Sequence, residues 1–189
     1  MKNFKDTCLL FVVLSGLIVS CNPAEQYKSE IAQIDSCLNV LDSLTVLFDG
    51  IEFDSLELMV AHVENNEAQI KQLYQPDTLM ESFGNLMNES KTVRKKLSVV
   101  GKDQLAIGDE LDTLKHQFGA LKMDILNGLF DDQQIVEYLT IEKAALSKVD
   151  AAFSNFYQMQ KKEKSRYYYT VPELDAFIEI LKTKNEALD

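Results

Sequence analysis

The chain has 189 residues, of which 46% are hydrophobic, and its 30 acidic side chains outnumber 19 basic ones to give a formal net charge of −11. This length suits one ordinary domain with its own hydrophobic core. An acidic surface repels nucleic acid on average, and the chain lacks the clustered basic face that phosphate binding requires, so nucleic acid is not an expected partner.

The N-terminal segment differs from the rest of the chain. Lys2 and Lys5 supply a positive start, and the run from Cys8 to Val19 contains about a dozen mostly apolar residues, which is the layout of a secretory signal. A membrane-spanning helix needs roughly 20 apolar residues, and Asn22 and Pro23 end this run too early. An uncleaved anchor or a buried N-terminal helix is the alternative interpretation.

The apolar run ends in Ile18-Val19-Ser20-Cys21, which resembles the lipobox of a type II signal peptide of bacterial lipoproteins. The resemblance implies that the Cys21 thiol carries diacylglycerol, that residues 1–20 are removed, and that the new terminal amine is acylated. More than one acyl chain anchors a protein stably. Asn22 stands where an aspartate retains enterobacterial lipoproteins in the inner membrane, so the resemblance implies the outer membrane, facing either the periplasm or the outside.

The remaining body, residues 21–189, is expected to be a single helical domain. Removal of the signal discards Cys8 and lipidation uses Cys21, which leaves Cys37 without an intramolecular partner. Cys37 is then either a small half-buried thiol on a helix or one half of an intermolecular disulfide.

Two helices are expected in the first part of this body. The first covers about residues 25–48 and has apolar side chains at spacings of three and four. These are Tyr27, Ile31, Ile34, Leu38, Leu41 and Leu44. Gly50 is expected to end the helix in the left-handed conformation. Asp54 and Glu57 have the spacing of a capping box, which predicts a second helix to about Tyr74. Pro76-Asp77 should end it and start the next.

A seven-residue apolar repeat then continues for about 45 residues. Its members are Leu79, Phe83, Leu86, Val93, Leu97, Val100, Ile107, Leu111, Leu114, Phe118, Leu121 and Ile125, and Ser90 and Gln104 interrupt it. Gly101 and Gly108 each weaken a continuous helix by about 1 kcal/mol relative to Ala. The unbroken phase favours one long rod, whereas a tight turn at residues 100–103 would give two helices of about 21–25 residues that pack as a bundle. We favour the turn.

Asn127-Gly128 is a strong stop, and Asp131 or Asp132 offers an N-cap for another helix reaching about Arg166. Its apolar positions are Ile135, Leu139, Leu146, Val149, Phe153 and Phe156, and Glu142 occupies the missing one. The short connection predicts a helical hairpin with antiparallel arms. Thr170, Pro172 and Glu173 predict the start of a further helix, which carries Leu174, Phe177 and Leu181.

The expected fold is therefore all-α: an elongated antiparallel helical bundle or coiled-coil-like helical hairpin, more than about 65% helical against roughly one third in average domains. Several amphipathic helices in one chain can cover one another, so we expect the seams to be buried internally rather than against a second copy.

Residues that could carry chemistry are sparse. His62 and His116 are the two histidines, and neither has the carboxylate or histidine spacing of a metal site. Paired carboxylates such as Asp131-Asp132 fall at predicted caps and polar faces. Phosphate loops, nucleophile elbows and dinucleotide motifs are absent from the sequence. We therefore expect no catalytic residue, no metal and no cofactor, and a protein that is not an enzyme.

One local segment suggests binding. The basic run of residues 161–166, which ends in Arg166, precedes Tyr167, Tyr168 and Tyr169. Tyrosine and arginine are enriched in interface hot spots, and three adjacent rings cannot all face one helix core. These four residues are the candidate partner-binding site. Alternatively, the basic residues complement the end of a helix and the tyrosines close the hairpin. A second basic group, residues 91–96, has the pattern of a solvated helix face.

These features favour a non-catalytic envelope adaptor, attached to the membrane by its lipid and presenting a helical body to a protein partner. The alternative is a binding protein for a small or cationic ligand, and an enzyme comes third. The signal and the helical texture together resemble small helical lipoproteins of Bacteroidota envelopes. Activity is generally unassigned in that group, so the resemblance implies location alone.

Overall fold

The computed structural model describes residues 22–74 and 81–187, of which 91% are helical and none lies in a strand. The all-α prediction is therefore confirmed. The helices are α2 (Pro23–Gln26), α3 (Lys28–Asp49), α4 (Phe53–Leu73), α5 (Glu81–Leu97), α6 (Val100–Leu126) and α7 (Asp132–Glu186). The lipidation expected at Cys21 and the helix boundary expected at Pro76-Asp77 lie outside the described residues.

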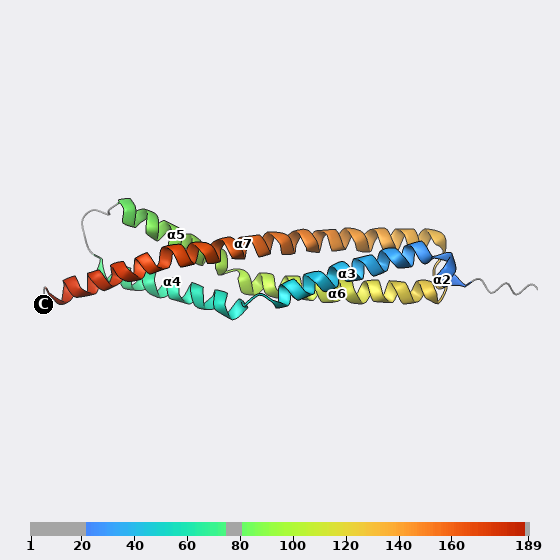
Figure 1. Ribbon diagram of the computed structural model, residues 1–189, viewed down its shortest axis with the longest axis horizontal. Coiled ribbons are helices and arrows are strands. Elements are labelled where there is room, and N and C mark those ends of the chain that lie inside the picture. Colours follow the sequence, from blue (N-terminus) through green and yellow to red (C-terminus); the bar gives the residue numbers. More distant parts are fainter. Residues whose placement is uncertain (1–21, 75–80, 188–189) are drawn as a thin grey trace, which may run out of the picture.

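The bundle is an elongated rod in which α7 runs along the whole length (Figure 1). Helices α3 and α6 pack against each other and against α7, and so do helices α4 and α5. Figure 1 shows the first pair beside the first part of α7 and the second pair beside its second part. We call these the α3–α6 half and the α4–α5 half, and the level where they meet along α7 the waist. Each half is thus a three-helix bundle, and α7 joins the two end to end.

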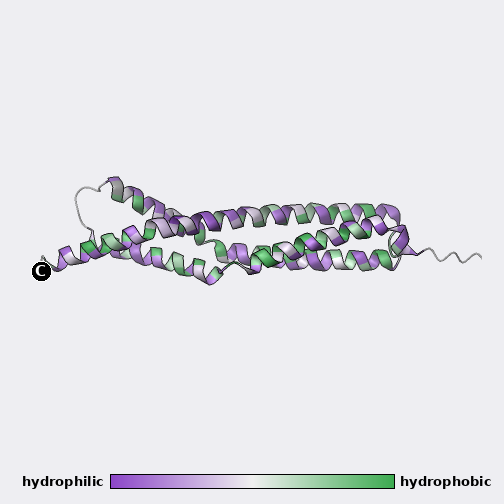
Figure 2. Ribbon diagram, viewed as in Figure 1, coloured by the Kyte–Doolittle hydropathy of each residue, from purple (hydrophilic) through white to green (hydrophobic). Residues whose placement is uncertain are grey.

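The predicted seams form the core of the rod. In α6 the buried positions include Leu111, Leu114 and Phe118, none more than 2% exposed. In α7 all six predicted apolar positions are buried, from Ile135 to Phe156. Hydrophobic and hydrophilic residues alternate along each helix as the amphipathic pattern requires (Figure 2). The chain therefore covers its own seams, as expected.

The turn between α6 and α7 matches the sequence prediction. Gly128 has φ of 69°, a left-handed conformation that glycine adopts without steric cost. Asp131 is the N-cap of α7: its Oδ1 accepts from the backbone N of Gln134 at 2.9 Å, and its own N donates to Gln134 Oε1 at 3.1 Å. This reciprocal capping box fixes the start of the longest helix.

Two predictions about the α3–α4 connection are wrong. Gly50 has φ of −76°, not a left-handed conformation, and α4 begins at Phe53 with Glu52 as an N-cap that makes no side-chain capping bond. Asp54 therefore lies inside the first turn of α4 and does not cap it. The physical reason is direction: α4 continues along the rod from the end of α3 (Figure 1), so the short connection keeps a right-handed turn instead of reversing the chain.

The long repeat is broken, as favoured, but earlier than expected. The turn lies at Ser98 and Val99, and Gly101 sits within the first turn of α6. Within the described residues, the resulting helices span 17 and 27 residues. Val99 keeps α-region angles, φ −93° and ψ −5°, so Leu97 and Val100 both remain buried across the turn. This explains why the phase of the repeat survives a break.

The predicted helix start at Thr170 is wrong, because α7 continues through Pro172 to Glu186. A proline inside a helix removes one donor and leaves the carbonyl four residues earlier without its partner. That carbonyl belongs to Tyr168, whose side chain is 60% exposed, and Pro172 is itself exposed. Water can therefore satisfy the carbonyl, while buried Val171 and Leu174 hold the helix against its neighbours.

Helix α3 has the length and mean hydropathy, 1.3, that would suit a membrane crossing. Core helices of bundles can share these properties, and α3 packs against α6 and α7 here. Lys122 Nζ on α6 binds Asp35 Oδ1 at 2.6 Å, and Lys115 Nζ binds Asp42 Oδ1 at 2.6 Å. Its apolar stripe is thus part of the core of the rod.

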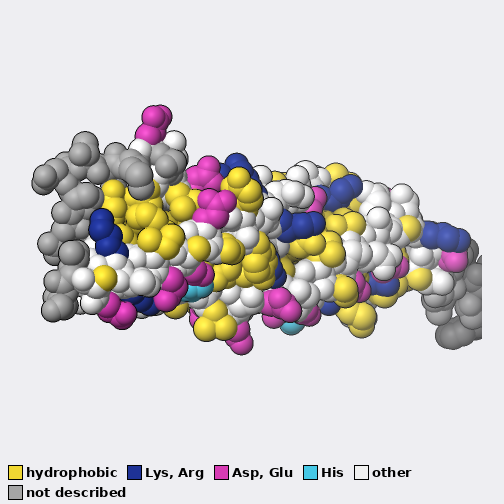
Figure 3. Space-filling view, turned by 60° about the vertical axis from the view of Figure 1, so that its left-hand side comes forward, with side chains coloured by type: hydrophobic (Ala, Val, Ile, Leu, Met, Phe, Trp, Pro, Cys, Tyr) yellow, Lys and Arg dark blue, Asp and Glu magenta, His cyan; other side chains and the backbone are white. Residues whose placement is uncertain are grey.

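The two halves differ in their cores. Among the described residues, five polar or charged residues are buried: Asn66, Ser90, Gln160, Glu163 and Thr170. All lie at the waist or in the α4–α5 half. A separate apolar cluster around Phe83, Leu174 and Ile178 closes the far end of that half, and Figure 3 shows apolar side chains gathered on the surface there.

Candidate functional site

The tyrosine segment lies on α7 where this helix packs against α4 and α5. Successive side chains on a helix point about 100° apart. Tyr167 accordingly faces inward and packs on the main core, while Tyr168 and Tyr169 are 60% and 72% exposed. The expectation that at least one of the three rings is exposed is confirmed.

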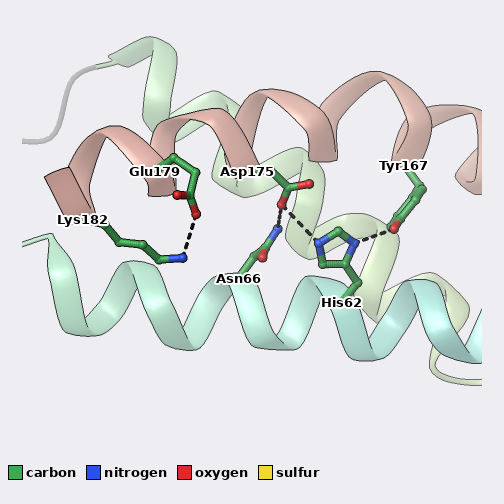
Figure 4. Close-up of polar contacts among 6 residues, drawn as sticks. All are labelled: His62, Asn66, Tyr167, Asp175, Glu179 and Lys182. Carbon is green, nitrogen blue, oxygen red and sulfur yellow. Dashed lines mark hydrogen bonds and ion pairs between the residues drawn. The ribbon is translucent and has the colours of Figure 1, made fainter.

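Tyr167 is held by a polar network between α4 and α7 (Figure 4). Its Oη lies 2.6 Å from His62 Nδ1, and His62 Nε2 lies 3.2 Å from Asp175 Oδ1. Asn66 Nδ2 also donates to Asp175 Oδ1, at 2.6 Å. The network ties one face of α4 to two positions on α7 that are about two turns apart, and it so fixes where the exposed tyrosines point.

The electrostatics of this network oppose an ionised tyrosine. Burial raises the pKa of the Tyr167 phenol, and the nearby Asp175 and Tyr168 raise it further. The protonated phenol can donate to His62 Nδ1, and a neutral imidazole can donate from Nε2 to Asp175. The same order of carboxylate, imidazole and hydroxyl occurs in catalytic triads, where the imidazole takes the hydroxyl proton. Here the hydroxyl belongs to Tyr167, whose raised pKa favours the protonated phenol as a hydrogen-bond donor.

Arg166, the fourth predicted site residue, is engaged within α7. Its Nη1 pairs with Oε2 of Glu163, whose side chain is 4% exposed, while that of Arg166 is 25% exposed. Lys164 Nζ in turn reaches Glu52 Oε2 at 3.3 Å. Much of the predicted basic run is therefore paired with carboxylates of the same chain, and Lys162 remains exposed.

The other residues singled out from sequence are dispersed. His116 lies on α6 beside a shallow groove of about 220 Å³ that Glu142 and Tyr138 of α7 also line, and burial raises the pKa of Glu142. Asp132 accepts from Tyr27 Oη at 2.7 Å. Within residues 22–74 and 81–187, no group of three or more His, Cys, Asp or Glu side chains could hold a metal ion.

The two remaining predictions concern Cys37 and the second basic group. Cys37 is a buried, free thiol on α3, and its burial raises the thiol pKa. In the basic group, Arg94 Nε binds Glu67 Oε1 at 3.1 Å between α5 and α4, whereas Lys91, Lys95 and Lys96 are exposed. The solvated-face interpretation therefore holds for the three lysines, and Arg94 instead links two helices.

Sequence reasoning missed the partners of Tyr167. His62 and Tyr167 are 105 residues apart in the chain, and no local motif connects them. The available signal was that His62 adjoins Val63 and follows Met59 by three, which places it at the edge of the buried stripe of α4.

Comparison with known proteins finds no matching family model, no matching curated protein and no matching solved structure. Any functional statement therefore rests on the geometry of the chain itself.

Proposed function

We propose that the protein is a non-catalytic adaptor of the bacterial cell envelope, anchored in the outer membrane through lipid on Cys21, and that its rod presents a docking surface to another envelope protein. The observation that carries the docking surface is the exposure of Tyr168 and Tyr169 beside an anchored Tyr167.

Exposed tyrosines on a rigid support suit recognition. A tyrosine ring offers a large apolar face and a polar hydroxyl, and it loses little entropy on binding. Tyr168 also packs edge-on against Tyr167, with ring centroids 5.4 Å apart. Because the His62 network holds Tyr167 in place, the neighbouring rings are preorganised, which lowers the cost of association.

The test is photo-crosslinking in native envelopes, with a benzophenone amino acid in place of Tyr169. Val136 is a matched control position: it lies on the same helix in the other half of the rod and is 60% exposed. We expect one defined protein adduct from position 169 and none of that mass from position 136. Tyr169→Ala should then abolish recovery of this partner at an unchanged melting temperature.

Equal adducts from both positions would show nonspecific contact and overturn the docking proposal. Retention of the partner by both Tyr168→Ala and Tyr169→Ala would overturn it as well. Acyl labelling tests the anchor separately: Cys21→Ala should abolish it, and an intact chain that retains residues 1–20 without lipid would contradict the anchor.

A further inference from the structure

A hollow of about 360 Å³ opens at the waist of the rod, where the end of α3 and the start of α4 meet α7. Its volume falls in the range of small-molecule sites, roughly 300–1,000 Å³. One wall is apolar and comes from the α3–α4 connection. The opposite wall is polar and comes from Gln160, Lys161 and Lys164 of α7.

The buried side-chain amide of Gln160 is the first observation that points to a ligand. The residue is only 7% exposed and lines the hollow, yet its side-chain amide makes no hydrogen bond to any described residue. Ser90 Oγ is the one fully inaccessible, unpartnered side-chain oxygen or nitrogen in the described part of the chain. The amide of Gln160 therefore keeps some accessible surface, and it has both a donor and an acceptor to offer a ligand in the hollow that this residue lines.

The charges around the hollow favour an anion. Lys161 and Lys164 lie on its α7 side, and Glu52 is the single acidic residue that lines it. Lys164 Nζ holds Glu52 Oε2 at 3.3 Å, but the Glu52 side chain is 74% exposed and can swing away. Lys161 Nζ lies 5.2 Å from the ring centre of Tyr157, which positions it by a cation–π contact. One positive charge in excess, in a chain of net charge −11, suits a monoanion.

The apolar wall of the hollow indicates that the ligand also has an apolar part. Val46 and Leu47 at the end of α3 are 72% and 48% exposed, although both line the hollow. Covering such side chains is worth about 25 cal/mol per Å² of apolar surface removed from water. A ligand with an apolar chain or ring beside its charged group would cover them.

We propose that the waist hollow binds a small amphipathic carboxylate. Its carboxylate oxygens accept hydrogen bonds from Lys164 Nζ and the Gln160 amide, and its apolar part lies on Val46 and Leu47. This site is independent of the docking surface formed by Tyr168 and Tyr169.

The test uses three probes with one carbon skeleton and different head groups: 3-phenylpropanoate, 3-phenylpropanamide and 3-phenylpropylamine. The full chain in lipid nanodiscs is titrated by calorimetry, with empty nanodiscs as the blank. We expect saturable binding of the carboxylate with one site per chain, weaker binding of the amide, and none of the amine.

Two variants identify the site. Gln160→Leu keeps the side-chain volume and removes the amide, and Lys164→Gln removes the cation; each should weaken carboxylate binding at least about tenfold, the effect expected for loss of a hydrogen bond to a charged group. Lys162→Gln is the matched control, because it makes the same charge change on the same helix outside the hollow. It should leave affinity unchanged.

Absence of saturable carboxylate binding would overturn the proposal. An equal loss of carboxylate affinity in Lys162→Gln and Lys164→Gln would also overturn it, since the effect would then come from the overall charge of the protein. Equal binding of the carboxylate and the amine would overturn it as well. Helical circular dichroism of each variant establishes folding, and the two site variants alter different groups, so failure of one to fold leaves the other to decide.

Discussion

Ser90 occupies a position that the seven-residue repeat reserves for an apolar side chain. It is fully buried on α5, and its Oγ has no hydrogen-bond partner among the described residues. Other hydroxyls on these helices bond back to the carbonyl four residues earlier, as Ser43 Oγ does to Asn39 O at 2.8 Å. An unsatisfied buried hydroxyl costs about 1–3 kcal/mol, so the interruption visible in the sequence marks a weak point of the core.

Ser90→Ala should therefore stabilise the protein by about 1 kcal/mol, because it removes the unpaired hydroxyl and improves helix propensity. Urea denaturation followed by circular dichroism measures this change. Ser154→Ala is the control, since it makes the same substitution on an exposed face of α7, where the serine side chain has no hydrogen bond to a described residue, and it reports helix propensity alone. A Ser90→Ala protein less stable than the parent would mean that the hydroxyl has a partner in solution.

The tyrosine segment shows how far the sequence predicts the placement of single side chains. Helical geometry alone requires three adjacent rings to point in different directions, and it correctly predicted that at least one of the rings is exposed. It could not predict that Tyr167 is the inward ring, because that depends on His62 and Asp175 meeting it from distant parts of the chain. The sequence likewise could not predict that Gln160 lines the hollow, since this depends on how α3 and α4 meet against α7.

At the scale of helices, a glycine within α6 and a glycine just after it have opposite roles. Gly119 lies within the helix, and a Cβ there would meet no heavy atom within 4 Å. Gly128 follows the helix with φ of 69°, where a side chain strains the backbone. The same residue type thus weakens the helix at one position and permits its turn at the other.

Gly119→Ala should raise the free energy of unfolding by about 0.5–1 kcal/mol, and Gly128→Ala should lower it by about 1 kcal/mol. Denaturant titrations of both variants against the parent protein measure these shifts. Because each variant adds one methyl group, burial of extra apolar surface cannot explain opposite signs. Shifts of the same sign would contradict the roles assigned to the two glycines.

Apolar spacing predicted most helices, because the spacing of the apolar residues from Ile135 to Phe156 fits one face of a helix and no other regular structure. It could not locate the α5–α6 turn, since Leu97 and Val100 keep helical spacing through α-region angles at Val99. It also ended the long arm at about Arg166 and started a further helix at Thr170, whereas α7 continues through Pro172. Whether a helix tolerates that proline depends on water reaching the Tyr168 carbonyl, which a linear pattern does not encode.

At the scale of the whole molecule, the two halves of the rod share α7 but differ in core chemistry. The α3–α6 half has an apolar core within the described residues, whereas Asn66, Ser90 and Thr170 are buried in the α4–α5 half. Thr170 Oγ1 reaches Glu89 Oε2 at a long 3.4 Å, and Ser90 Oγ forms no hydrogen bond within residues 22–74 and 81–187. Polar groups that are partly satisfied contribute less stability than packed apolar side chains.

The α4–α5 half should therefore open more readily than the α3–α6 half, as a separate cooperative unit. Hydrogen exchange measured by mass spectrometry should show amides of α4 and α5 exchanging at least about tenfold faster than those of α3 and α6, which corresponds to roughly 1.4 kcal/mol in opening free energy. Within α7, residues 135–156 should be better protected than residues 160–181. Ser90→Ala should slow exchange in α4 and α5 and leave α3 and α6 unchanged. If all five helices exchanged at one rate, or if Ser90→Ala slowed exchange along the entire rod, the bundle would open as a single unit and α7 would couple the two halves completely.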